Sequence, residues 1–143
     1  MAGSAGPDLV QNGLVLALDA ADKLSYLGTG TVWYDLSGNA NTGTLTNGPT
    51  FSQANGGAIV FDGVDDYVNI PYNSIFNSST TFTVDFWFKS NNIAPEQVFF
   101  STTNTSLTSG YHIQVYVSKN LFQVSALAHS RWLHKRDQSY RLR

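Results

Sequence analysis

Alternation of apolar and polar residues is the clearest pattern along this chain, and it indicates β-strands. It is most regular over residues 81–89, TFTVDFWFK, where every second residue is large and apolar. One face of this segment would carry Phe82, Val84, Phe86 and Phe88, and the other Thr81, Thr83, Asp85, Trp87 and Lys89. Because successive side chains of a strand point to opposite faces, this period of two predicts a core strand. Trp87 is expected to pack beneath a loop rather than to form an exposed aromatic platform.

A second strand signal lies in residues 58–70, AIVFDGVDDYVNI. Two apolar runs rich in β-branched and aromatic residues, 58–61 and 67–70, flank an acidic turn at residues 62–66. Gly63 permits the backbone to reverse there without a Cβ clash. The pattern predicts an antiparallel hairpin in which the two runs pair with each other.

Shorter apolar runs between Ser, Thr, Asn and Gly loops predict the remaining strands. Residues 13–19 are apolar almost throughout, which favours a buried strand; a helix is the alternative, since Leu and Ala are good helix formers. Further strands are expected at residues 31–34, 42–46, 97–101, 111–117 and 121–127, with one helical turn around residues 74–76. Short strands at this spacing, without a long amphipathic helix, predict an all-β fold of two antiparallel sheets packed as a sandwich.

The composition agrees with this class. Of 143 residues, 13% are charged and 13% are aromatic, which suits an all-β domain with long polar loops. The organisation expected is a flexible leader at residues 1–12, a sandwich at residues 13–128 and a basic tail at residues 129–143. There is no Cys, which excludes disulfides and cysteine–metal sites. Neither a membrane span nor a secretory signal is expected from the hydropathy pattern.

Charge is distributed unevenly along the chain. Residues 1–128 carry nine Asp or Glu against three Lys, whereas residues 129–143 carry five Arg or Lys against one Asp. The tail residues considered for partner binding are Arg131, Trp132, Lys135 and Arg136. Because the body is acidic, an acidic protein surface, such as another copy of the body, is a more natural target for the tail than nucleic acid. Nucleic acid is therefore not expected as the main partner.

Four segments follow one another in an order that is typical of one fold family. They are GLVLALDA at residues 13–20, WYDLSGNANTGTLTNGP at residues 33–49, AIVFDGVDDYVNI at residues 58–70 and TFTVDFWFK at residues 81–89. Together they resemble laminin G-like (concanavalin A-like) jelly-roll modules, above all those of phage structural proteins and bacterial surface proteins. The resemblance implies a two-sheet antiparallel jelly roll in a virion or on an extracellular surface. A homo-oligomer or an assembly with other virion or surface subunits is expected as well, on the ground of the chain's departure from the family pattern at its end.

The chain departs from the family pattern at two places. Ala40 stands where the family usually has Gly, and Trp132 and His134 lie in a basic run that does not resemble the family's closing strands. Three interpretations of this ending stay open: an alternative ending, a partner-binding arm and the product of a shifted reading frame. A jelly roll that lacks its usual last strands would have an open sheet edge, which favours pairing with another chain.

The acidic turn is the candidate metal site. Asp62, Asp65 and Asp66 offer several oxygen atoms on one tight loop, as Ca²⁺ prefers, and Asp35 or Asn39 would add an oxygen if the two turns meet. Calcium near such loops is also what the resemblance implies. In the alternative interpretation, Asp62 caps the turn through backbone N–H groups and the other carboxylates are solvated.

Sugar binding would use aromatic rings that stack on sugar faces. The candidates beside predicted loops are Tyr26, Trp33, Tyr34, Tyr72 and Tyr111, and for each of them packing in the core or at its rim is the alternative. Glycanases of this fold need a pair of acids on one strand. Residues 81–89 contain only Asp85, and no Glu-x-Asp-x-Glu pattern exists, so no catalytic residues are expected.

These observations favour a non-catalytic recognition or structural module of a virion, of the phage decoration or tail-fibre type, or of a cell-surface assembly. It would bind glycans or neighbouring subunits. A calcium-dependent carbohydrate-binding (lectin) module of a larger secreted protein is the second hypothesis, and a glycanase-fold enzyme is the third.

Overall fold

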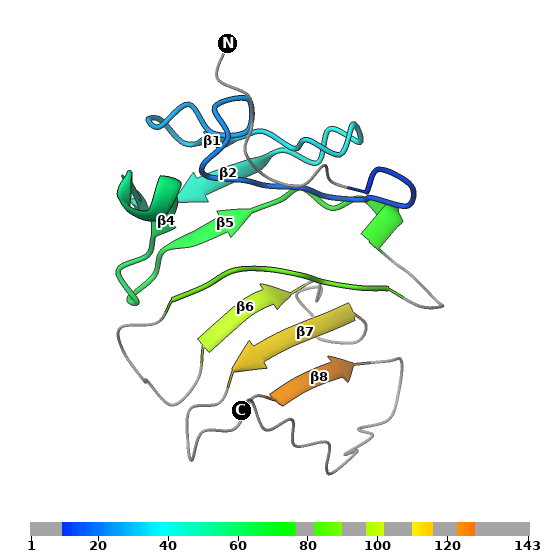
Figure 1. Cartoon of the computed structure of the whole chain (residues 1–143). Coiled ribbons are helices and arrows are strands. Elements are labelled where there is room, and N and C mark those ends of the chain that lie inside the picture. The colour runs from blue at the N-terminus through cyan, green and yellow to red at the C-terminus, as the bar shows by residue number, and fades with distance from the viewer. Residues whose placement is uncertain (1–9, 77–81, 90–96, 102–109, 116–122, 128–143) are drawn as a thin grey trace. The chain divides into compact units, whose positions relative to one another are not determined.

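The chain is all-β in the part that its computed structural model describes, which comprises residues 10–76, 82–89, 97–101, 110–115 and 123–127. Eight short strands and two 3₁₀ turns make up the regular structure of these residues (Figure 1). The chain divides into two compact units, Met1–Phe76 and Asn77–Arg143. This boundary lies within the single sandwich expected at residues 13–128. None of the described helices is both long and apolar enough to cross a membrane.

Unit 1 is built on a three-stranded antiparallel sheet. Its strands are β1 (Val32–Trp33), β2 (Gly43–Thr46) and β5 (Tyr67–Asn69), in the order β1-β2-β5. The register places Trp33 opposite Gly43 and Leu45 opposite Val68, and these four residues share the inner face. The outer face carries Val32, Thr44, Thr46, Tyr67 and Asn69. The strand expected at residues 42–46 is thus confirmed and lies at the centre of this sheet.

The core of unit 1 lies under the inner face. Tyr26 and Leu45 are 2% and 4% exposed. The Tyr26 ring packs against Trp33 and Phe51, with centroid distances of 6.4 and 5.4 Å, and its hydroxyl donates to the Gly30 carbonyl over 2.7 Å. Tyr26 is therefore a core residue, which confirms the packing interpretation and removes it from the sugar-binding candidates.

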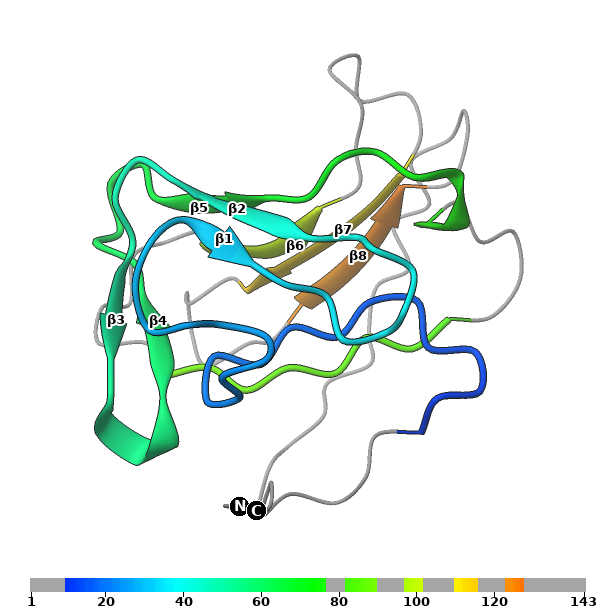
Figure 2. The same ribbon diagram turned by 90° about the horizontal axis from the view of Figure 1, so that it is seen from above.

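A hairpin does form in unit 1, but not the expected one. Strand β4 (Ala58–Val60) pairs with β3 (Thr50–Ser52) across the 3₁₀ turn η1 (Ala54–Gly56), and β5 pairs with β2. Figure 2 shows β3 and β4 standing to one side of the β1-β2-β5 sheet. The predicted pairing of residues 58–61 with residues 67–70 is wrong because the acidic turn leads from one sheet to the other.

Residues 13–19 form no strand, although a buried strand was the expectation. Residues 14–18 are half-buried, and their backbone groups form hydrogen bonds with side chains as well as with other backbone groups. Ala17 donates its N–H to the Asp35 carboxylate, and its carbonyl accepts from the Leu36 N–H over 2.9 Å. The prediction failed because side chains of residues 35–41 replace the partner strand along this segment.

Unit 2 contains a second antiparallel sheet. Its strands are β6 (Gln97–Ser101), β7 (Gly110–Val115) and β8 (Gln123–Leu127), in the order β6-β7-β8. The register of β6 against β7 shifts between Val98 and Phe100. These strands confirm the positions expected around residues 97–101, 111–117 and 121–127. The helical turn expected around residues 74–76, in unit 1, is confirmed as the 3₁₀ turn η2 (Ser74–Phe76).

Residues 82–89 belong to unit 2 and run as an extended segment outside any sheet of the described residues (Figure 1). The alternation holds in part: Val84 and Phe86 are half-buried, while Asp85 and Lys89 are exposed. The prediction of a core strand is nevertheless wrong, because Phe82 and Phe88 are also exposed. Trp87 is 99% exposed, which contradicts the expectation that it packs beneath a loop.

Candidate functional site

Asp35 is the centre of a hydrogen-bond network in unit 1. Its Oδ1 accepts from the backbone N–H groups of Ala17 and Ser37, both over 2.9 Å. Its Oδ2 accepts from the Ser37 hydroxyl over 2.7 Å and from the Asn41 backbone N–H over 2.9 Å. Burial raises the pKa of Asp35, but the bond from the Ser37 hydroxyl and the three backbone N–H bonds outweigh it, so the pKa lies below its ordinary value.

The side chains that follow Asp35 hold the segment at residues 13–19. The Asn39 amide nitrogen donates to the Leu14 carbonyl over 2.9 Å, and the Asn41 amide nitrogen donates to the Val15 carbonyl over 2.9 Å. The Asn41 amide oxygen accepts from Asn73 over 2.9 Å. The turn therefore acts as a structural clamp, and the sequence reasoning missed this role.

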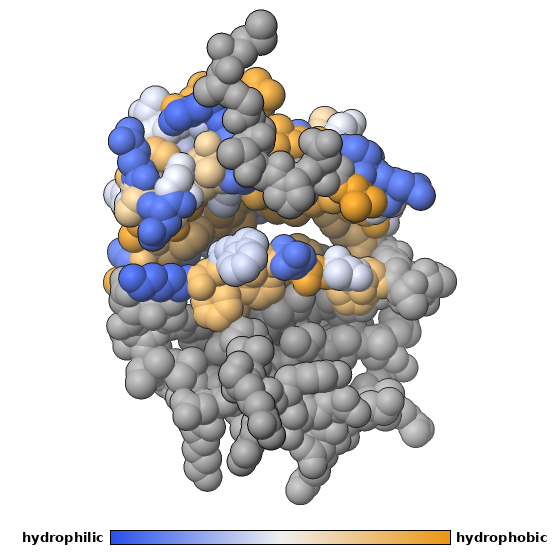
Figure 3. Space-filling view, in the orientation of Figure 1, coloured by the Kyte–Doolittle hydropathy of each residue, from blue (hydrophilic) through white to orange (hydrophobic). Residues whose placement is uncertain are grey.

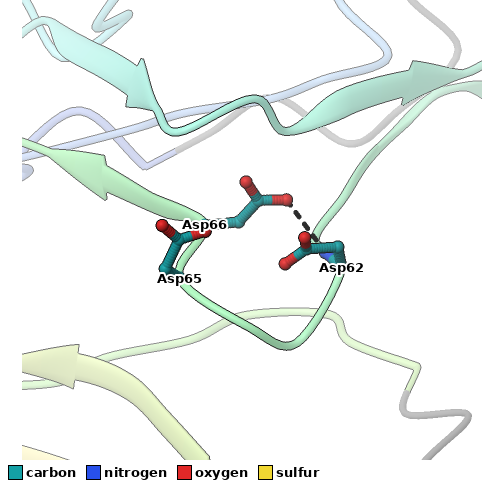
Figure 4. Close-up of side chains that lie close together, drawn as sticks. All are labelled: Asp62, Asp65 and Asp66. Atoms are coloured by element: carbon teal, nitrogen blue, oxygen red, sulfur yellow. Dashed lines mark hydrogen bonds between the residues drawn. The ribbon is translucent and has the colours of Figure 1, made fainter.

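The acidic turn brings three carboxylates together. Asp62, Asp65 and Asp66 each offer an oxygen atom, and these atoms lie within 4.8 Å of one another (Figure 4). The turn is tied internally, since Asp66 accepts from the Asp62 backbone N–H over 2.9 Å and Asp62 accepts from the Val64 backbone N–H over 2.8 Å. Both the capping role and the clustering expected for these carboxylates are therefore present.

The donor set of this turn fits a hard cation. Two oxygens on one Ca²⁺ at 2.3–2.6 Å lie at most roughly 5 Å apart, so a spacing within 4.8 Å is compatible with shared coordination. Asp35 is not a member of the group, and both of its oxygens accept hydrogen bonds within the clamp. Asn39 is likewise engaged there through its amide nitrogen. Three of the five predicted ligands are thus brought together.

The predicted sugar-binding residues lie in different environments. Tyr72 is 78% exposed and Tyr34 is 43% exposed. Trp33 is half-buried with its ring 6.4 Å from that of Tyr26, and its buried Nε1 has no hydrogen-bond partner among the described residues. Tyr111 lies in β7. The four tail residues Arg131, Trp132, Lys135 and Arg136 lie outside the described residues.

The outer face of the β1-β2-β5 sheet carries Thr44, Thr46 and Asn69, the exposed apolar Val32 and one aromatic side chain, Tyr67, that the sequence reasoning did not single out. Tyr67 is 50% exposed and lies opposite Thr46, while Asn69 lies opposite Thr44 on the same face. Directly opposed residues of an antiparallel pair have Cβ atoms about 4.5–5.5 Å apart, so the Thr46 side chain lies beside that of Tyr67, and Asn69 shares the face two residues further along β5. The period of two in residues 67–69 could have indicated this placement.

Comparison with protein-family models gave no match, and comparison with curated proteins gave none. Among solved structures, the chain is similar to an S-layer domain-containing protein (residues 221–444) from Clostridium thermocellum ATCC 27405, with 29% identity and a TM-score of 0.48. The similarity covers 61% of this chain and 40% of that chain.

Proposed function

We propose that this chain is a non-catalytic recognition module with a laminin G-like jelly-roll sandwich, part of a virion or an extracellular surface assembly. It binds glycans or neighbouring subunits. The observation that carries the proposal is the outer face of the β1-β2-β5 sheet, where the half-exposed Tyr67 lies opposite Thr46 and on the same face as Thr44 and Asn69.

This surface has the chemistry that a sugar requires. An aromatic ring offers an apolar face to the C–H groups of a pyranose, while hydroxyl and amide groups bond to its hydroxyls. The register keeps these groups on one side of a short sheet, because Tyr67 and Asn69 are two residues apart on β5 and their partners are two residues apart on β2. An uncharged face of this kind suits a neutral glycan.

Glycan-array screening followed by titration calorimetry tests the proposal. Tyr67→Ala is expected to abolish the binding of the best glycan, and Asn69→Ala is expected to weaken it. Leu24→Ala changes an exposed apolar side chain outside the sheet and serves as the matched control. Separate Tyr34→Ala and Tyr72→Ala variants show whether either predicted tyrosine extends the site.

Two results would decide against glycan recognition. If no glycan binds while the chain assembles with itself or with other subunits, the module is a structural part alone. If a β-glucan is turned over and Asp85→Asn abolishes the turnover, the chain is an enzyme, and the non-catalytic proposal is wrong.

A calcium-dependent lectin module is the second candidate function. The observation that favours it is the approach of the Asp62, Asp65 and Asp66 oxygens to within 4.8 Å. Under this alternative, these three carboxylates would hold the ion and fix the acidic turn beside β5. Glycan binding that requires calcium, and that a chelator reverses, would support this candidate over the first.

A further inference from the structure

Residues 82–89 form an extended chain with one side exposed and the other packed in part, since Val84 and Phe86 are half-buried whereas Phe82 and Phe88 are exposed. Phe86 and Phe88 lie against Phe99 of β6, with ring-centroid distances of 5.3 and 4.4 Å. On the opposite side, Thr83, Asp85, Trp87 and Lys89 are all exposed. The space-filling view shows hydrophilic and hydrophobic colours side by side on this face of the molecule (Figure 3). Within unit 2, the segment is therefore attached to β6 by aromatic packing.

One backbone edge of this segment is unpaired within the described residues. In an extended chain, alternate residues direct their N–H and C=O groups to the same edge. Within the described part of the chain, the backbone groups of Thr83, Asp85, Trp87 and Lys89 form no hydrogen bond. Such an edge is a template for an additional strand.

We propose that this edge pairs with the same segment of a second copy, antiparallel and about a two-fold axis at Trp87. In this register Trp87 lies opposite its own counterpart, and Asp85 lies opposite Lys89 of the second copy. The symmetry creates the charge pair twice. On the inner side, Phe86 lies opposite Phe88 of the second copy, so aromatic rings meet across the interface.

Charge complementarity selects this register over its neighbours. An axis at Asp85 would place two Asp85 carboxylates directly opposite each other, which is unfavourable. An axis at Phe86 would place Asp85 opposite Trp87 and Lys89 opposite Thr83, which leaves both charges without a direct partner. A shift by a single residue would exchange the inner and outer faces. The axis at Trp87 alone pairs every charge in the segment with its opposite.

Single-cysteine variants test both the dimer and its register, because the native chain contains no Cys. Directly opposed Cα atoms of a hydrogen-bonded antiparallel pair are about 5.5 Å apart, within disulfide range. Trp87→Cys is therefore expected to form a covalent dimer with oxidised glutathione as the oxidant. Asp85→Cys and Lys89→Cys should each fail alone, since like positions would be about 14 Å apart, but should cross-link when mixed.

A charge exchange tests the proposal without removing Trp87. Asp85→Lys, in sedimentation velocity, is expected to raise the dimer dissociation constant roughly tenfold or more, because it opposes two Lys at both symmetric positions. The double variant with Asp85→Lys and Lys89→Asp should restore dimerisation. Thr83→Lys adds a charge to the same exposed side outside the paired stretch from Asp85 to Lys89 and should leave the dimer intact.

The proposal is wrong if the chain stays monomeric at all concentrations, or if all single-cysteine variants cross-link equally. It is also wrong if the charge-exchange variants leave the dimer dissociation constant unchanged. A dimer that forms only with a different protein's strand on this edge would also overturn it. The inference is independent of sugar recognition, because it concerns unit 2, whereas the proposed glycan surface lies in unit 1. Cross-linking and glycan binding can therefore fail separately.

Discussion

Replacement of Asp35 by Asn would test whether the clamp on residues 13–19 stabilises unit 1. The amide of the variant keeps one oxygen, which still accepts from the backbone N–H groups of Ala17 and Ser37. Its nitrogen would replace the Oδ2 atom that now accepts from the Ser37 hydroxyl and the Asn41 backbone N–H. The hydroxyl has another acceptor within reach, the Val15 carbonyl at 3.0 Å, but the N–H of Asn41 does not rotate.

The expected loss follows from these contacts. Asn41 is buried, so its backbone N–H would face another donor without water, which costs about 1–3 kcal/mol. The two bonds that remain lose their charge-assisted strength, which adds roughly 1 kcal/mol. A total of about 3 kcal/mol is a large part of the typical stability of a domain and corresponds to a melting temperature lower by roughly 10 °C.

Urea unfolding followed by circular dichroism and tryptophan fluorescence would measure this loss. Asp22→Asn is the matched control, because among the described residues the Asp22 carboxylate accepts a single exposed local bond, from the Leu24 backbone N–H. Asp22→Asn should lower the free energy of unfolding by well under about 1 kcal/mol. Equal stability losses in the two variants would refute the claim that Asp35 holds the clamp together.

Three further predictions concern pH, calcium and packing. The folded-state pKa of Asp35 lies below its ordinary value of 3.8, so the ionised carboxylate contributes to the free energy of unfolding above that value, and this contribution is lost as the pH falls through the folded-state pKa. The difference in stability between the native chain and Asp35→Asn should therefore disappear in acid. A difference that stays constant with pH would contradict this. The melting temperature of the native chain should be higher in calcium than in a chelator, and Asp62→Ala should remove this difference. If the native chain shows no difference, the metal site is excluded. Gly43→Ala should lower the free energy of unfolding in urea by about 1–3 kcal/mol, because the new Cβ would lie 2.8 Å from Val68 Cγ1. Thr44→Ala, on the outer face, should lower it less. The reverse order would show that the inner face is not closely packed.

Local patterns predicted the acidic cluster well but not the role of Asp35. Asp62, Asp65 and Asp66 lie within one five-residue turn, so their approach needs no information from elsewhere in the chain. Asp35 was expected as a metal ligand, but its Oδ1 bonds to Ala17, which lies 18 residues away in the sequence. That contact forms only when the two segments meet, and it converts a candidate ligand into a structural acceptor.

The same distinction applies to the aromatic residues. Tyr26 and Tyr67 are both tyrosines near turns, yet one is 2% exposed and the other 50%. Tyr26 is buried because Trp33 and Phe51 pack around it. Tyr67 is exposed because the register of β5 on β2 directs Val68 to the inner face and its neighbours outward. The side of a sheet on which a residue lies depends on that register, which a short strand cannot predict alone.

The sequence by itself determined the all-β class and the positions of most strands. Period-two alternation and turn residues are local properties, and they suffice to bend or extend the backbone. The tertiary structure decided which segments pair: β4 with β3, β5 with β2, and residues 13–19 with side chains in place of a strand. Alternation reports which side of a strand is apolar, but every strand edge carries the same N–H and C=O groups. The choice among partners therefore depends on how the whole unit packs.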